Sequence, residues 1–173
     1  MSAINQIQLS FAPVEDRLLL RLNTTDAAEF RFWLTRRYVK LLWPVLMKML
    51  QDELAAYNSE EAKQEILSFQ FQEAAQNMDY STSFDENVRE RPLGDVPILL
   101  ARISTKKRED GTQLLSLHPE DGQGIDLALN QKLLHSICKL LQDALKKTDW
   151  DLDFSDTLST NILISGGEPR TIQ

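Results

Sequence analysis

The stretch FRFWLTRRYVKLLW, residues 30–43, is the most informative part of the chain because its hydrophobic period changes in the middle. It opens with apolar residues at every second position, Phe30, Phe32 and Leu34, as in a strand with one buried face. Thr35 then stands where a helix N-cap belongs, and the residues after it repeat with a helical period. The stretch therefore predicts a strand that leads through a cap into a helix.

Residues 125–138, IDLALNQKLLHSIC, repeat this order with Asn130 as the predicted cap. An offset of 95 residues (125 − 30) aligns the two stretches without a gap and also places the upstream Leu20 on Leu115. Each half of the chain then has the order strand, strand, strand, helix, which favours an internal structural repeat. The alternative is that two amphipathic segments are merely similar, since any two segments of one type can be aligned.

Alternating hydrophobic patterns upstream of each stretch predict two hairpins. Their segments are 4–12 with 17–23 around the turn PVED, and 97–105 with 112–118 around Asp110-Gly111. A rival interpretation begins a helix near Asp26, where Glu29 completes a capping-box spacing. The corresponding strand of the second half follows DGQG, which is a poor helix start and a good loop, so a strand is favoured in both halves.

Three helices are predicted. The first runs from Arg36 to about residue 57, with a kink where Pro44 removes a backbone hydrogen bond. The second starts at a capping box of Asn58 and Glu61, and its apolar positions are Ile66, Leu67 and Phe69. The third runs from residue 131 to about residue 147, with these positions inside: Leu134, Ile137, Cys138, Leu141 and Leu145. Its positions in solvent are Lys132, His135, Lys139 and Lys146, and a last strand is predicted at residues 161–164.

The predicted fold class is α+β, an internal duplication of a βββα unit with antiparallel sheets covered by helices. The predicted boundaries are residues 1–76 for the first βββα half with an extra helix, 77–96 for a polar linker or loop, 97–165 for the second half with a C-terminal strand, and 166–173 for a flexible tail. Because one such unit is small for independent stability, the two halves are expected to form one compact domain.

The composition of 42% hydrophobic and 26% charged residues is that of a folded globular protein, and the net charge of -7 disfavours a surface that is basic throughout. The longest apolar run, residues 41–47, is too short to span a bilayer, so no membrane association is predicted. The N-terminal residues MSAINQIQLS lack the features of a secretory signal, and a single cysteine agrees with a reducing compartment. The expected location is the cytoplasm.

The repeated order of hairpin, strand and helix resembles the PUR-type and Whirly-type single-strand nucleic-acid-binding modules, in topology only. The segments VEDRLLLRL (Val14–Leu22) and FWLTRRYVKLLWP (Phe32–Pro44) resemble a family of bacterial conserved hypothetical proteins over the first third of the chain. This resemblance implies a bacterial protein and carries no activity with it.

Six residues form the candidate binding site for single-stranded nucleic acid: Arg17, Arg21, Arg31, Trp33, Arg36 and Arg37. The first four share the outer face of the predicted sheet, where arginines suit phosphates and an exposed ring suits a base. The alternative is that these arginines pair with the abundant acids and that Trp33 packs at an interface. The matching face of the second half carries Asp126 instead of a basic residue, which disfavours nucleic acid.

Other reactive side chains do not form a recognisable site. The acidic run of Asp149, Asp151 and Asp153 lacks the glycine and glutamate of a calcium loop. His118 and His135 have no ligand-like spacing to each other or to Cys138, and no phosphate or dinucleotide motif is found. No metal, cofactor or catalytic residue is therefore predicted.

The leading hypothesis is a non-enzymatic interaction or adaptor module that forms a homodimer. It follows from surplus apolar residues on the predicted outer faces of the sheets: Leu19, Trp33, Ile98, Leu100 and Leu114.

Overall fold

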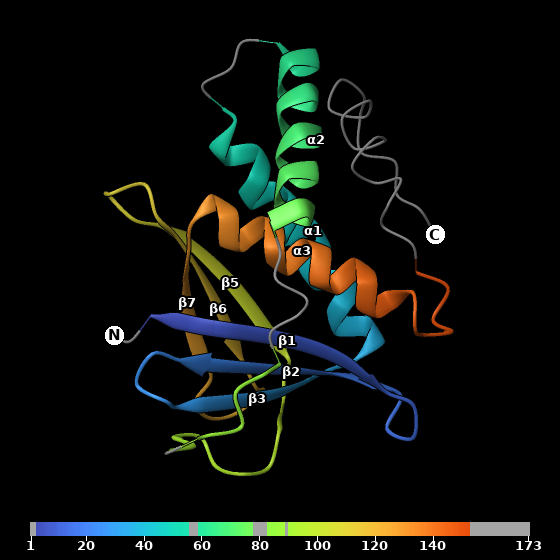
Figure 1. Cartoon of the computed structure of the whole chain (residues 1–173), viewed down its shortest axis with the longest axis vertical. Coiled ribbons are helices and arrows are strands. Elements are labelled where there is room, and N and C mark those ends of the chain that lie inside the picture. The colour runs from blue at the N-terminus through green and yellow to red at the C-terminus, as the bar shows by residue number, and fades with distance from the viewer. Residues whose placement is uncertain (1–2, 56–58, 78–82, 89, 153–173) are drawn as a thin grey trace.

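The computed structural model describes residues 3–55, 59–77, 83–88 and 90–152 (Figure 1). In chain order its elements are β1 (Ile4–Ala12), β2 (Arg17–Thr24), β3 (Glu29–Leu34), α1 (Arg36–Glu53), α2 (Glu60–Asn77), β4 (Ile98–Leu99), β5 (Arg102–Lys107), β6 (Gln113–His118), β7 (Ile125–Leu129) and α3 (Gln131–Leu145). The strands form one sheet in the order β1-β2-β3-β4 and another in the order β5-β6-β7. The α+β class is confirmed. The strand predicted at residues 161–164 and the tail from residue 166 lie outside the described residues.

The two halves share one strand register. Leu20 lies opposite Phe32 in the β2–β3 pair, and Leu115 lies opposite Leu127 in the β6–β7 pair. Both members of the second pair follow from the first by the same offset of 95 residues (115 − 20 and 127 − 32). A shift of one residue would turn every side chain to the other face, so this agreement is consistent with a duplicated βββα unit.

The predicted N-caps occupy equivalent places in the two halves. The Thr35 hydroxyl accepts a hydrogen bond from the Tyr38 amide at 3.2 Å, and the Asn130 side chain accepts one from the Leu133 amide at 2.8 Å. Each cap satisfies one of the free amides of a first helical turn, which fixes where the strand ends and the helix begins.

The segment predicted as one strand at residues 97–105 is divided between the sheets, which corrects that prediction. Ile98–Leu99 pairs in parallel with β3, whereas Arg102–Lys107 pairs with β6. The Leu100 amide donates to the Trp33 carbonyl at 3.0 Å, and the next amide, Ala101, donates to the His118 carbonyl at 2.9 Å. Consecutive residues thus bond to different sheets. The hydrophobic pattern of residues 98–100, Ile-Leu-Leu, does not alternate as it would in a single strand. The reason is that Leu100, where the chain passes from one sheet to the other, is buried in the core.

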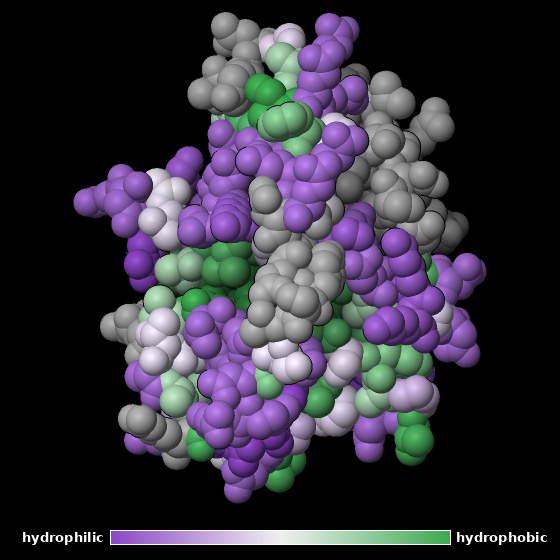
Figure 2. Space-filling view, viewed as in Figure 1, coloured by the Kyte–Doolittle hydropathy of each residue, from purple (hydrophilic) through white to green (hydrophobic). Residues whose placement is uncertain are grey.

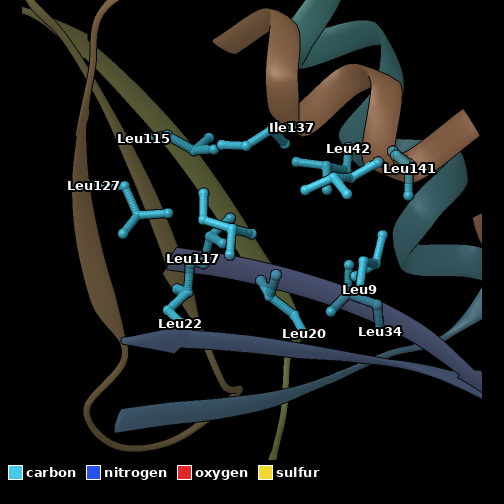
Figure 3. Close-up of a pocket in the computed structure, with 12 residues that line it drawn as sticks. Leu9, Leu20, Leu22, Leu34, Leu42, Leu115, Leu117, Leu127, Ile137 and Leu141 are labelled. Atoms are coloured by element: carbon cyan, nitrogen blue, oxygen red, sulfur yellow. The ribbon is translucent and has the colours of Figure 1, made fainter. Parts of the chain in front are cut away.

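The core lies where the inner faces of both sheets meet α1 and α3. The side chains that converge there are Leu9, Leu20, Leu22 and Leu34 of the first sheet, Leu115, Leu117 and Leu127 of the second, and Leu42, Ile137 and Leu141 of the helices (Figure 3). Burying one such side chain stabilises the fold by about 1.5–3 kcal/mol. The free volume at the junction, about 30 Å³, is room for only a few water molecules. The space is therefore packing between the two units and too small for a ligand.

The two N-terminal helices depart from prediction at their ends. Helix α1 continues through Pro44 and ends at Glu53, with Leu54 as C-cap, instead of near residue 57. The Ser59 hydroxyl, just before α2, accepts a hydrogen bond from the Ala62 amide at 3.0 Å. The predicted capping box begins at Asn58, which lies outside the described residues. Phe69 is 65% exposed and is not an inner position of this helix. The predicted kink stays a prediction.

Helix α3 buries four of the five residues predicted for its inner stripe, including Cys138, and Ile137 is half-buried. His135, predicted to face solvent, is buried as well, with 2% exposure. Its Nε2 lies 3.1 Å from Gln70 Oε1, and its ring meets the edge of Phe71 on α2. The prediction that His135 faces solvent was wrong because it used only the periodicity of α3. In the fold, α2 covers that face of α3. Within the described ranges no helix is both long and apolar enough to cross a membrane.

Candidate functional site

The outer face of the first sheet brings together several of the candidate residues. Arg21 and Arg31 lie directly opposite each other on β2 and β3, and Trp33 follows on the same face, opposite Leu19. Arg17 begins β2 at one end of this face. Arg36 and Arg37 do not lie on the sheet, because Thr35 ends the strand and both belong to the first turn of α1.

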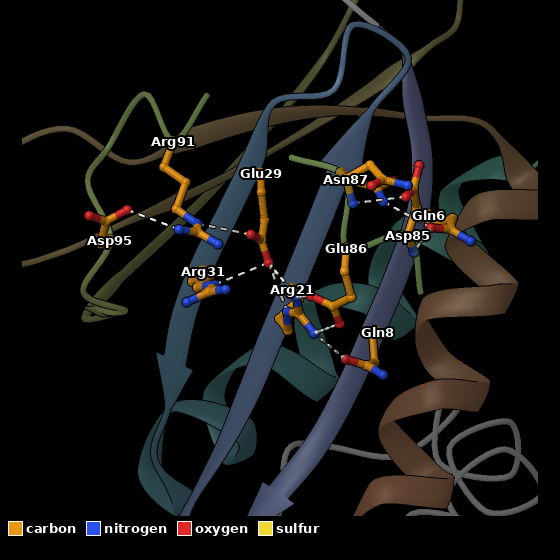
Figure 4. A network of polar contacts seen from close by, with 11 residues as sticks. Gln6, Gln8, Arg21, Glu29, Arg31, Asp85, Glu86, Asn87, Arg91 and Asp95 are labelled. Carbon is orange, nitrogen blue, oxygen red and sulfur yellow. Dashed lines mark hydrogen bonds and ion pairs between the residues drawn. The ribbon is translucent and has the colours of Figure 1, made fainter. Parts of the chain in front are cut away.

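Glu29 is the centre of the charged network on this face (Figure 4), and its side chain is 0% exposed. One carboxylate oxygen accepts from Arg21 at 2.7 Å and Arg31 at 3.0 Å, and the other accepts from Arg91 at 3.0 Å. Burial by itself would raise the pKa of Glu29, but the hydrogen bonds from Arg31, Arg21 and Arg91 outweigh it and hold the pKa below its ordinary value. The carboxylate is therefore charged at neutral pH and fixes the three guanidinium groups.

Residues 83–88 and 90–95, called the strap below, cross the outer face of the sheet. Both polar atoms of the Gln6 side-chain amide bond to the first residues of the strap. The amide nitrogen donates to the Ser83 carbonyl at 3.1 Å, and the amide oxygen accepts from the Asp85 backbone amide at 2.8 Å. The Glu29 amide donates to the Glu90 carbonyl at 2.9 Å. A segment predicted as a linker is thus attached to β1 and β3 by hydrogen bonds.

The strap also occupies the donors of Arg21. Glu86 receives two hydrogen bonds from this guanidinium, at 3.0 and 2.8 Å, and Gln8 receives a third at 3.3 Å. The Phe84 ring lies over the same group, with its centroid 4.2 Å from Cζ. The hydrogen bond to Glu86 is the largest influence that raises the pKa of Arg21. This arginine has no donor left to offer a phosphate unless the strap moves.

The remaining candidates are less constrained. Arg17 is half-buried, Arg36 and Arg37 are exposed, and none of the three has an ion pair with another residue in the described parts of the chain. The strap leaves a row of apolar side chains on neighbouring strands, called the outer row here: Leu19, Trp33 and Leu99. The first two are half-buried, and Leu99 is 44% exposed.

Glu29 was not among the residues selected from the sequence, although the sequence contains a signal for it. Like charges directly opposite each other on paired strands are destabilising. The β2–β3 pairing in the structure sets Arg21 against Arg31, so it requires an acid nearby, and Glu29 is on the same face two residues before Arg31. The third arginine, Arg91, is 62 residues away along the chain. No local pattern identifies it.

The other reactive side chains have ordinary structural roles. His118, at the end of β6, lies 3.3 Å from Asp126. Burial raises the pKa of the Cys138 thiol well above its usual range, which disfavours a reactive thiolate. Among the described residues, no three histidine, cysteine or acidic side chains are grouped as a metal ion would need. Asp153 of the acidic run lies outside those residues.

Comparison of the chain with models of protein families, with curated proteins and with solved structures found no match.

Proposed function

We propose that the protein is a non-enzymatic interaction module that binds a partner protein through the outer row. The observation that carries this proposal is that Leu19, Trp33 and Leu99 are neighbours on three strands and remain partly exposed beside the strap. A tryptophan among apolar neighbours, bordered by arginine, has the composition of an interface centre. The proposed setting is the bacterial cytoplasm.

The charged network supports a structural role for the rest of the face. Three arginines, Arg21, Arg31 and Arg91, are balanced by three acids, Glu29, Glu86 and Asp95. A balanced and mutually bonded set is rigid, and a rigid surface loses little conformational entropy when a partner binds. The network thus holds the sheet and the strap in place beside the outer row.

The test is recovery of a partner from an extract of the native cell by the tagged protein. Leu99→Asp should reduce the amount of recovered partner by about tenfold, because it buries an unpaired charge at the proposed contact. Phe69→Asp is the matched control, since it adds the same charge to an exposed apolar position on α2. Equal recovery with the wild type and Leu99→Asp, with both proteins folded, would refute the outer row as the binding surface.

A second candidate function is binding of single-stranded nucleic acid, and one observation favours it. Arg17, Arg36 and Arg37 have no acid partner among the described residues, and Trp33 is partly exposed. Against it, Arg21 and Arg31 are committed to Glu29. The candidate predicts binding of a mixed oligonucleotide that weakens steeply with salt. Flat anisotropy titrations at low salt would eliminate it.

A further inference from the structure

Four residues at the start of α1 line a surface hollow of about 340 Å³: Arg36, Arg37, Lys40 and Leu41. We call this surface the basic hollow. All four side chains are exposed, Leu41 to 51%, and the first turn of α1 holds no acid. Two cations in a first helical turn are unfavourable, because the helix dipole is positive there. The hollow therefore presents concentrated positive charge around one apolar side chain, in a chain whose net charge is -7.

A surface of opposite character lies at the turn between β1 and β2. This hairpin tip consists of Pro13, Val14, Glu15 and Asp16, and Val14 is 100% exposed. Hydrophobic atoms project at the lower right of Figure 2, where Figure 1 places this turn. The tip thus carries one apolar side chain followed by two carboxylates.

The hairpin tip is held in a defined conformation. Asp16 has a left-handed backbone with φ of 53°, and its carboxylate accepts from Trp150 Nε1 at 2.6 Å. The Trp150 ring in turn meets Phe11 of β1 edge to face, with centroids 5.9 Å apart. An exposed apolar side chain on a braced turn loses little entropy on binding, which is what a docking element needs.

The second half of the molecule shows that the fold requires neither surface. At the offset of 95 residues the basic hollow corresponds to Gln131, Lys132, His135 and Ser136, which keep only one exposed cation. The corresponding turn, residues 108–112, has the sequence Arg-Glu-Asp-Gly-Thr, and none of these residues is large and apolar. Because both halves form the same βββα unit, these features of the first half need an explanation other than folding.

We propose that the hairpin tip of one copy docks in the basic hollow of a second copy of this chain. Val14 then covers Leu41, and the carboxylates of the tip face Arg36, Arg37 and Lys40. The pairing of Leu18 with Leu34 places the tip and the start of α1 at the same end of the sheet. A two-fold axis between the copies therefore lets both contacts form at once. The inference does not depend on the outer row.

The test measures self-association of the whole chain by analytical ultracentrifugation at low salt. The wild type should dimerise, and Glu15→Arg or Arg37→Glu should each weaken the dimer by about tenfold, because an attractive pair becomes a repulsive one. The charge-swapped double variant, Glu15→Arg with Arg37→Glu, should recover most of the affinity. The control variants make the same changes in the second half: Glu109→Arg and Lys132→Glu.

Three results would overturn the inference. The first is a wild type that stays monomeric at every concentration tested. The second is a double variant that is as weak as either single one, because tip and hollow then do not meet. The third is an equal effect of Lys132→Glu, which would indicate a general influence of net charge. None of these three results changes the partner-recovery experiment with Leu99→Asp. The outer row is therefore tested separately from self-association.

Discussion

At the scale of single residues, Glu29 combines complete burial with three ion pairs. Glu29→Gln keeps the size of the side chain and removes its charge, so three guanidinium groups lose their common partner. We expect the free energy of unfolding at neutral pH to fall by about 2 kcal/mol. Chemical denaturation measures this loss. Glu86→Gln is the control, because its carboxylate pairs with Arg21 in solvent and should matter much less.

The contribution of Glu29 should also depend on pH. Its pKa in the folded protein lies below the ordinary value of 4.5, so the native state holds this group charged while the unfolded chain begins to bind a proton. The contribution is complete above the ordinary pKa and is lost as pH falls through the folded-state pKa. The stability difference between wild type and Glu29→Gln should therefore narrow at acidic pH. A difference that stays constant would contradict the ion-pair explanation.

His135 gives a second prediction, in a different pH window. Burial lowers its pKa from the ordinary 6.5 to about 4. The unfolded chain therefore binds a proton between these values while the native state does not, and stability falls as pH decreases across that interval. The loss should be roughly 3 kcal/mol. Denaturation curves of His135→Gln should lack this slope, and equal slopes in both proteins would refute the assignment.

At the scale of elements, the two caps offer a matched comparison. Thr35 and Asn130 are equivalent in the repeat, and each accepts a hydrogen bond from the third residue of its helix. Thr35→Ala and Asn130→Ala should each lower the free energy of unfolding by about 1 kcal/mol. Thr35→Ser and Asn130→Asp keep the acceptor and should cost much less. Thermal unfolding of the four variants checks this, and a loss in only one half would show that the units are not energetically alike.

The elements also show what the sequence can predict here. Strands β1, β2, β3 and β7 and both caps follow from alternation and local chemistry, which act within a few residues. The crossing at Leu100 and Ala101, the attachment of the strap to Glu29 and the burial of His135 beneath α2 depend on contacts between segments far apart in the chain. In the candidate site, Arg21 and Arg31 could be selected from the sequence because they are basic residues on one face of the sheet. Their ion pairs with Glu29 could not be predicted in the same way, because these pairs depend on how the strands are aligned.

At the scale of the whole molecule, the two sheets share one core and are joined at consecutive residues, Leu100 and Ala101. Leucines of β2 and β6 converge on the same space (Figure 3). If either unit opens, the inner face of the other loses its cover and exposes apolar surface to water. The two units should therefore unfold together, although each has its own sheet and helix.

Leu34 and Leu129 test this cooperativity, because they are equivalent in the repeat and are 1% and 0% exposed. Either Leu→Ala change should lower the stability of the whole protein by about 3 kcal/mol, through lost burial and the cavity left behind. In a Trp150→Phe background, the fluorescence of Trp33 and Trp43 reports on the first unit, whereas circular dichroism reports on both units. For Leu129→Ala the two signals should shift together and give one midpoint. A fluorescence transition that stays at the wild-type midpoint while circular dichroism moves would show that the units are independent domains.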